Sequence, residues 1–232
     1  MALHFLFDLL ALAAGWFSSI RFRSSLNSTD RSPLPPSHLH GYLLIIIIGL
    51  VAGSIFFGSL NLWLAGKTAA AKSVIGGLFG AILAAEIYKL KAGIQGSTGL
   101  VFIPGLTVGI IIGRVGCFLA GIDDFTYGTP TELFWGVDFG DHIKRHPVQL
   151  YESFTMLLFL LIFLHSFRNN RQFWLDKGFY IFVLVYAGQR FIWEFLKPYP
   201  EVLSVFNVFH LLALLLILYS LFMLTKASTH AE

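Results

Sequence analysis

Apolar runs of membrane-spanning length follow one another along this chain, separated by short polar stretches. A helix that crosses the hydrocarbon core of a bilayer needs about 20 mostly apolar residues. Two of the runs are less regular than the others, one because it is short and one because it carries an arginine and a glutamate. The pattern predicts an all-α integral membrane protein, a bundle of about seven transmembrane helices. The seven runs are residues 3–20, 41–63, 73–90, 99–119, 147–166, 178–197 and 203–225.

Composition leaves no room for a sizeable soluble domain. Hydrophobic residues make up 56% of the 232 residues and charged residues only 12%, whereas a soluble domain carries roughly 25% charged residues. We therefore expect one membrane domain over residues 1–232, with the lipid bilayer as its partner. The net charge of +3 arises from basic residues scattered over short loops, which argues against a nucleic-acid partner. The single cysteine, Cys117, excludes an internal disulfide.

The basic residues indicate orientation, because Lys and Arg are enriched on the cytoplasmic side of a membrane. With the N-terminus outside, nine of the sixteen lie on the inner side and five, including Lys197, on the outer side, while Arg114 and Arg190 lie within helices. Arg21 and Arg23 follow the first run and no basic residue precedes it, the reverse of a signal peptide. We expect a multi-pass protein of the plasma (inner) membrane, with its C-terminus in the cytoplasm.

The stretch between the fourth and fifth runs, residues 120–146, is rich in Gly, Asp and aromatic residues. Its turn-forming residues and aromatic spacing predict an ordered flap, a short loop or hairpin on the outer face. Such a flap would cover a site that opens to the outer leaflet. A metal site on Asp123, Asp124, Asp138 and His142 is an alternative, but a solvated acidic loop explains these residues more simply. We therefore expect no metal and no cofactor.

Small residues at helical spacing predict close helix packing. Gly105, Gly109 and Gly113 are four residues apart, and Gly76, Gly80 and Ala84 form a second such stripe. Membrane helices associate through contacts of this kind, because burying apolar surface gains little between lipid-solvated partners.

Charged side chains inside apolar segments point to function, because each costs at least about 2.5–3.5 kcal/mol at a helix centre. Arg114 lies in the segment GIIIGRVGCF between Gly113 and Gly116, with no acid within helical reach on its N-terminal side. A guanidinium flanked by glycines lets an anion approach closely and offers bidentate geometry. The abundant anion with that geometry in a membrane is a lipid phosphate.

A second charged stripe lies in the sixth run. Tyr186, Arg190 and Glu194 are four residues apart and so share one helix face. The simpler explanation is an intrahelical ion pair that neutralises itself.

A third group lies in the segment RHPVQLYE, where Pro147 marks a helix start. Gln149 and Glu152 could cap that start. The density of His146, Gln149, Tyr151 and Glu152 in seven residues favours a site instead.

In this order, GRVGCF, RHPVQLYE and the Y-x3-R-x3-E stripe resemble the prolipoprotein diacylglyceryl transferase family, from about residue 73 onward. The resemblance implies transfer of the diacylglyceryl group of phosphatidylglycerol to the lipobox cysteine of a prolipoprotein, with glycerol phosphate leaving. It implies an anionic phospholipid and prolipoprotein signal peptides as partners. In the implied site, Arg114 and Arg190 handle the lipid phosphate and Glu194 acts beside them. The implied substrate-binding residues are Gly113, Gly116, Gly76, Gly77, Gln149, Tyr151, Glu152 and Tyr186.

The chain also departs from the family pattern. It has Cys117 and Ala120 where the family has asparagines, and Ile122 near the position of a glutamate. The family's His-Gly-Gly appears here as Ile75-Gly76-Gly77, and isoleucine cannot accept a proton.

Either another residue supplies the base that thiol attack requires, or the chemistry is different or absent. His146 is the best candidate, because an imidazole titrates near neutral pH, and the intramembrane acids Glu86 and Asp8 are alternatives.

Two other functions fit the same residues. A divergent homologue would keep the lipid pocket and use another acceptor, such as a glycan or a small hydroxylated compound. A lipid or anion transporter would use the arginines for binding only, although no inverted repeat is visible in the sequence.

Overall fold

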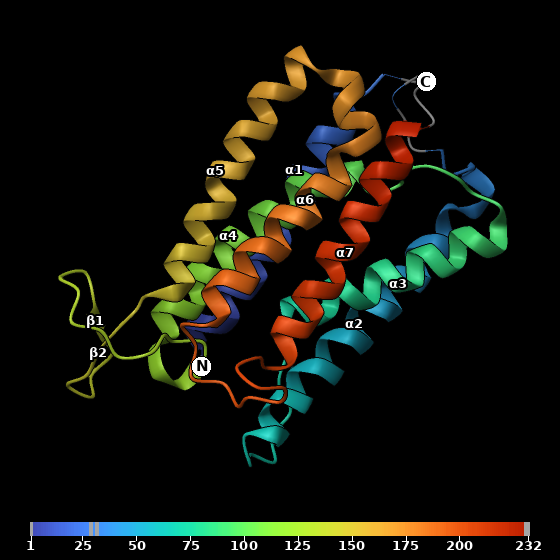
Figure 1. Cartoon of the computed structure of the whole chain (residues 1–232). Coiled ribbons are helices and arrows are strands. Elements are labelled where there is room, and N and C mark those ends of the chain that lie inside the picture. Colours follow the sequence, from blue (N-terminus) through green and yellow to red (C-terminus); the bar gives the residue numbers. More distant parts are fainter. Residues whose placement is uncertain (1, 28–29, 31–32, 230–232) are drawn as a thin grey trace. The chain divides into compact units, whose positions relative to one another are not determined.

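The computed structural model describes residues 2–27, 30 and 33–229, and this part of the chain forms seven α-helices (Figure 1). The predicted all-α bundle is confirmed. The helices are α1 (Ala2–Ser24), α2 (Leu39–Leu64), α3 (Val74–Ala92), α4 (Ile103–Ala120), α5 (Val148–Asn169), α6 (Arg171–Glu194) and α7 (Val208–Thr229). Three 3-10 turns accompany them, η2 (Pro36–His38), η3 (Leu100–Phe102) and η4 (Gly121–Asp124).

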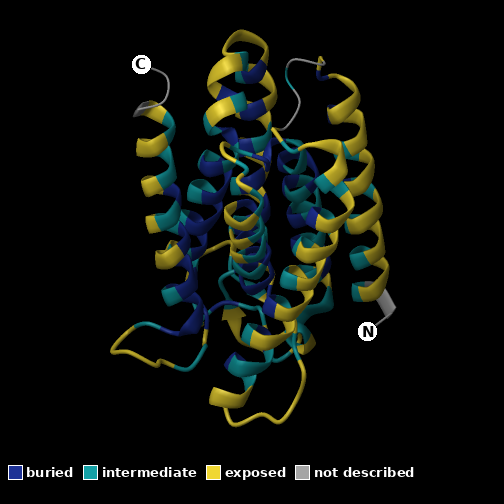
Figure 2. Ribbon diagram, turned by 90° about the vertical axis from the view of Figure 1, so that its right-hand side faces the viewer, coloured by how far each residue is buried: buried dark blue, intermediate teal, exposed yellow. Residues whose placement is uncertain are grey.

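Among the described residues, five segments are long and apolar enough to cross a membrane, namely residues 4–24, 36–64, 100–124, 148–169 and 208–228. Many of their large apolar side chains are exposed, as the yellow stretches of Figure 2 show; Trp16, Leu44 and Phe222 are examples. Lipid is the solvent that suits such a surface. The protein is therefore a multi-pass membrane protein. The remaining helices, α3 and α6, correspond to the two less regular runs of the sequence.

The helix α6 begins at Arg171, before the predicted start at residue 178. Asp176 and Lys177 interrupt the apolar run there, so hydropathy places the start too late. The helix α7 begins at Val208 and not at residue 203, because residues 202–206 form a turn closed by an isolated bridge between Leu203 and Phe206.

The chain forms two compact units, and each is described by itself. The first comprises residues 1–31 and 99–198 and contains α1, α4, α5, α6 and the flap. In it α4 packs against α1 and α5, and α5 packs against α6. At Gly105 α4 approaches α1 closely, since a Cβ there would lie 2.6 Å from the Gly15 carbonyl oxygen. The Ser153 hydroxyl joins α5 to α4 by donating to the Ile111 carbonyl at 3.1 Å.

The second unit comprises residues 32–98 and 199–232, with α2, α3 and α7. The predicted glycine stripe of α3 packs against α2. A Cβ on Gly80 would lie 2.1 Å from the Gly49 carbonyl oxygen, and one on Gly76 would lie 2.7 Å from that of Gly53. The α3 helix begins where the Ser73 hydroxyl accepts a hydrogen bond from the Gly76 amide, and it ends at Gly93 in the left-handed conformation.

The flap between α4 and α5 contains the predicted hairpin. Strands β1 (Val137–Asp138) and β2 (Lys144–Arg145) pair antiparallel, with Val137 opposite Arg145. The Asp138 carboxylate closes the turn by accepting the amides of Gly140, Asp141 and His142. Arg145 donates to Asp141 over 2.6 Å, and this hydrogen bond holds the pKa of that carboxyl below its usual value. The flap is therefore an ordered element.

We predict that Gly105→Ala loosens the α1–α4 contact, whereas Gly109→Ala on the same helix face does not. The new methyl at residue 105 would overlap backbone, but at residue 109 it would meet the Ala11 carbonyl oxygen at an ordinary 3.6 Å. Overpacking of this kind costs about 1–3 kcal/mol. Thermal unfolding in detergent measures the difference, and equal melting temperatures for the two variants would contradict it.

Candidate functional site

The carboxylate of Glu152, in the first turns of α5, is fully buried and lies between cations from two other segments of the first unit. Arg114 Nε of α4 lies 2.5 Å from Oε2, and Arg190 Nη1 of α6 lies 2.5 Å from Oε1. The Nζ of Lys197, three residues beyond the end of α6, lies 2.6 Å from the same Oε1. One carboxylate thus joins three helices.

Glu194 extends this group on α6. Its Oε2 lies 2.7 Å from Arg190 Nη2 and 3.9 Å from Lys197 Nζ. The intrahelical pair of Arg190 and Glu194 therefore forms, as the simpler explanation of that stripe requires. It does not stand alone, because Arg190 also pairs with Glu152 of the neighbouring helix. We call Arg114, Glu152, Arg190, Glu194 and Lys197 the charge cluster.

Lys197 was missed as a site residue and counted among outer-loop lysines, but it is 5% exposed and buried in the charge cluster. A signal existed in the sequence. Residues 190, 194 and 197 follow helical spacing, so the lysine continues the charged face by one turn. The following Pro198 made the segment look like a loop. Without Lys197 the basic residues still favour the inner loops, so the expected orientation is unchanged.

The charge cluster carries a net positive charge, since its three cations exceed its two carboxylates by one. All five side chains are buried, where an unpaired charge is costly and an ion pair must be complete to be tolerated. The surplus positive charge therefore suits one monoanion. A phosphodiester has that charge, and two arginines provide the planar donors that phosphate oxygens prefer.

The α5 helix starts directly after Pro147, as predicted, and Glu152 of the charge cluster lies in its first turns. Pro147 is the N-cap of α5, and no side chain caps that end. Gln149 and Glu152 are instead both fully buried in the first turns of the helix. Their alternative role as caps is wrong, and one face of the α5 start points into the unit.

Buried amides and a phenol lie on the helices of the charge cluster. Gln149 precedes Glu152 by one helical turn, and its two carboxamide atoms have no hydrogen-bond partner among the described residues. The same holds for the buried Gln189, next to Arg190, which the sequence reasoning missed. Tyr186 is fully buried one turn before Arg190 and stacks on Phe182. Since buried amides normally find partners, these two favour a polar ligand.

His146 and Tyr151 lie at the junction of flap and α5. The His146 Nδ1 is 3.3 Å from the Tyr151 hydroxyl, which also accepts a hydrogen bond from the Trp135 indole over 2.7 Å. The Tyr151 ring packs beside Trp193 of α6. The flap thus contacts the start of α5 through aromatic and imidazole groups, and His146 is half-buried there.

The predicted binding glycines fall into two kinds. Nothing lies within 4 Å of a Cβ built on Gly113, whereas one on Gly116 would lie 2.4 Å from Phe7 Cβ of α1. Gly113 therefore leaves space beside Arg114, and Gly116 serves helix packing. Gly76 and Gly77 belong to the second unit, where both pack against α2.

The alternative bases have partners of their own. Glu86 pairs with Lys89 at 2.9 Å and accepts a hydrogen bond from the Tyr219 hydroxyl. Asp8, which has no obvious partner in the sequence, lies 3.3 Å from His4 Nδ1. Ile75 is fully buried in the first turn of α3.

The chain is similar to one known protein family over most of its length. The family model of prolipoprotein diacylglyceryl transferase matches residues 11–226. The chain belongs to this family. A phosphatidylglycerol–prolipoprotein diacylglyceryl transferase of Finegoldia magna is 33% identical over 102 residues, which are 44% of this chain and 40% of that protein. The protein of the same name from Methylococcus capsulatus is 36% identical over 127 residues, 53% of this chain and 46% of its own length.

The matched part of the chain thus spans less than half the length of these curated relatives of the family. No solved structure matches the chain significantly. The resemblance that GRVGCF, RHPVQLYE and the Y-x3-R-x3-E stripe carry in the sequence is confirmed by the match to the family model.

We predict that Glu152→Gln strongly destabilises the protein, because three buried cations lose their shared anion. Breaking a buried ion pair in this way costs about 3–5 kcal/mol. Denaturant unfolding of the purified protein measures the loss, and Glu132→Gln, at an exposed flap position, is the matched control.

Adding Lys197→Met to Glu152→Gln removes one surplus cation and should restore part of the stability. Additive losses in the double variant would show that the lysine and the glutamate do not interact.

Proposed function

We propose that this protein transfers the diacylglyceryl group of phosphatidylglycerol to the thiol of a lipobox cysteine in a prolipoprotein. The observation that carries the proposal is the net positive charge of the buried charge cluster. Arg114 and Arg190 flank Glu152 at 2.5 Å each, and guanidinium groups are the donors that a phosphodiester prefers. Membership of the family supplies the reaction type.

The reaction places a simple demand on the charge cluster. A thiolate attacks the glycerol carbon that carries the phosphate, a C–S bond forms, and the C–O bond to phosphate breaks. The bonding pair stays with the phosphate oxygen, so glycerol phosphate leaves as a dianion. The lipid's single negative charge balances the cluster at the start. The added charge of the leaving group is stabilised by Arg114, Arg190 and Lys197, all preorganised around Glu152.

The buried amides suit the rest of the lipid head group. Gln149 and Gln189 each offer one acceptor and two donors in a buried environment. The glycerol hydroxyls of phosphatidylglycerol match these groups, whereas a choline head group offers no hydrogen-bond donor. Gly113 leaves room beside Arg114 for the lipid. Recognition of the head group would then combine one phosphate and two hydroxyls.

The proton of the attacking thiol must go to a base. We assign that role to His146, which is half-buried at the start of α5 and bonded to Tyr151. The flap holds its backbone, because the His146 amide donates to the Thr129 carbonyl and the His146 carbonyl accepts from the Gly128 amide. Tyr151 orients the ring, and the imidazole takes the thiol proton to give the attacking thiolate.

The expected orientation of the protein decides on which side of the membrane the reaction takes place. With the N-terminus outside and the C-terminus in the cytoplasm, the flap and the start of α5 face the outer side of the plasma membrane. Signal peptides of prolipoproteins and anionic phospholipid would both reach the site from the bilayer there. A different acceptor, or lipid and anion transport without chemistry, remain the alternatives that experiment must separate.

We predict that Arg114→Ala and Arg190→Ala each abolish transfer, because either change removes a phosphate donor and the surplus positive charge of the cluster. The assay uses purified protein, labelled phosphatidylglycerol and a lipobox peptide, and measures release of glycerol phosphate and lipidation of the peptide. Arg168→Ala, at an exposed position on α5, is the control and should retain full activity.

The same assay separates the alternatives. Release of glycerol phosphate only when another acceptor replaces the peptide would favour the divergent homologue. Lipid binding without release under any condition would favour the transporter. Full activity of both arginine variants would remove the charge cluster from the mechanism.

We predict that His146→Gln lowers kcat by about 10²–10⁴-fold and leaves the KM for lipid little changed, as expected for loss of a general base. His142→Gln, an exposed histidine of the same flap, is the control. Wild-type kinetics of His146→Gln would place the base elsewhere.

A further inference from the structure

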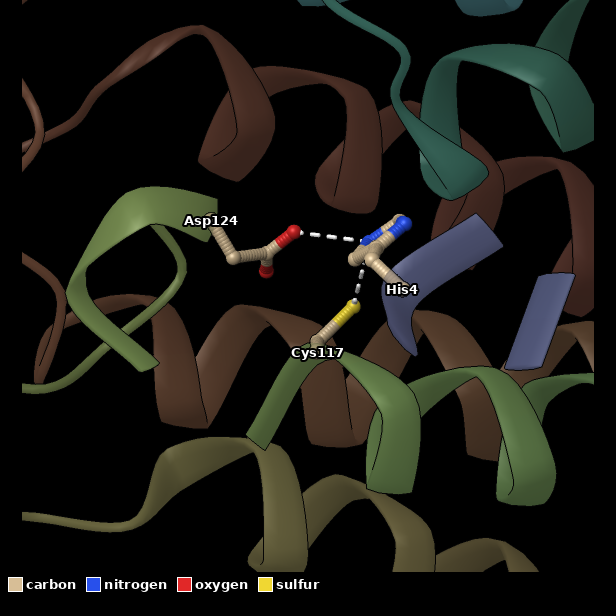
Figure 3. A group of neighbouring side chains, drawn as sticks. All are labelled: His4, Cys117 and Asp124. Carbon is tan, nitrogen blue, oxygen red and sulfur yellow. Dashed lines mark hydrogen bonds and ion pairs between the residues drawn. The ribbon is translucent and has the colours of Figure 1, made fainter. Parts of the chain in front are cut away.

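Three side chains that are distant in sequence converge near the N-terminal end of α1, outside the charge cluster (Figure 3). They are His4 of α1, Cys117 of α4 and Asp124 of η4. The His4 Nε2 lies 2.8 Å from Asp124 Oδ1 and 3.8 Å from Cys117 Sγ. All three ligand atoms lie within 4.8 Å of one another. An imidazole nitrogen, a thiol sulfur and a carboxylate oxygen thus surround one point.

The atoms of these residues that face away from this point have partners of their own. The His4 Nδ1 lies 3.3 Å from the Asp8 carboxylate one turn further along α1. The Asp124 Oδ2 accepts a hydrogen bond from the Thr126 hydroxyl. Metal-bound histidines usually donate their second ring N–H to a carboxylate, and metal-bound carboxylates are held by further hydrogen bonds. Asp8 and Thr126 are placed for both roles.

We propose that His4, Cys117 and Asp124 bind a divalent transition metal ion of the zinc type. A tetrahedral Zn²⁺ ion with bonds of about 2.0–2.3 Å separates its ligand atoms by roughly 3.3–3.7 Å. The observed distances of 2.8 and 3.8 Å require only a small spreading of His4 and Asp124. The three protein ligands leave a fourth position for water or another small ligand.

Charge and ligand type select the ion. A thiolate and a carboxylate supply two negative charges and a neutral imidazole supplies none, so a divalent ion makes the site neutral. Binding releases the thiol proton, and the imidazole nitrogen that faces Asp124 must give up any proton it carries. Sulfur and imidazole ligands favour Zn²⁺ or Co²⁺ over Mg²⁺ and Ca²⁺, which prefer oxygen. The bound ion would tie the start of α1 and η4 to α4.

The competing explanation is a metal-free network in which His4 is a hydrogen-bonding bridge between Asp8 and Asp124. Both explanations account for the two carboxylate contacts of the ring. Only the metal site needs the Cys117 sulfur as a ligand, so spectroscopy of a sulfur–metal bond separates them.

The test titrates the purified full chain, stripped with a chelator and kept reduced with a phosphine, with Co²⁺ alone. We expect one Co²⁺ per chain with a thiolate-to-cobalt charge-transfer band in the near ultraviolet. Zn²⁺ should displace the band at equimolar concentration, and Mg²⁺ should not. A wild-type protein that shows no such band overturns the proposal.

Variants locate the site. Cys117→Ser should abolish the band, His4→Ala should weaken binding at least tenfold, and Asp8→Asn should weaken it about 10–100-fold through loss of the outer carboxylate. His142→Ala removes an exposed histidine that lies 3.9 Å from Asp138, and this control should bind as the wild type does. Circular dichroism and gel filtration check the fold of each variant. An unchanged band in Cys117→Ser also overturns the proposal.

Discussion

The carboxylate of Glu152 is the interaction on which the first unit depends. A charge in a low-dielectric environment must have a counter-charge within contact distance, and here one carboxylate meets that need for Arg114, Arg190 and Lys197. The cations come from α4 and from the end of α6 with the residues after it, so their shared anion on α5 fixes the mutual positions of the three helices. Because an unpaired buried charge is costly, each cation must lie within contact distance of a carboxylate, and this requirement makes the arrangement of the helices specific.

The surplus positive charge connects this architecture to chemistry. A fully neutralised set of pairs would serve packing alone, but here three cations face two carboxylates, and the proposed function assigns the excess charge to an anionic lipid. Two buried glutamines without partners among the described residues add polar capacity on the same helices. In the proposed reaction the cluster balances the bound lipid and then stabilises the departing phosphate. Glycine packing, at Gly105 against α1, brings α4 into the unit that holds this site.

The hydrophobic pattern predicted the seven helices well, because the requirement to satisfy backbone hydrogen bonds in lipid fixes helix length and composition. It failed at element ends, where charged residues such as Asp176 and Lys177 lie inside α6 but outside any apolar run. The predicted stripes showed where helices pack closely at Gly105, Gly76 and Gly80, but not at Gly109 and Gly113. The identity of their partners, α1 and α2, depends on three-dimensional packing that spacing does not encode.

The sequence by itself determined the membrane class, the family and the arginines Arg114 and Arg190, since intramembrane charges stand out in an apolar chain. Only the tertiary structure decided that Glu152 is the common partner of both and that Lys197 joins them. It alone brought His4, Cys117 and Asp124 to one point. The physical reason is the same in both cases. Helical periodicity fixes neighbours on one helix, whereas contacts between helices depend on how their faces pack, and a local pattern carries little of that information.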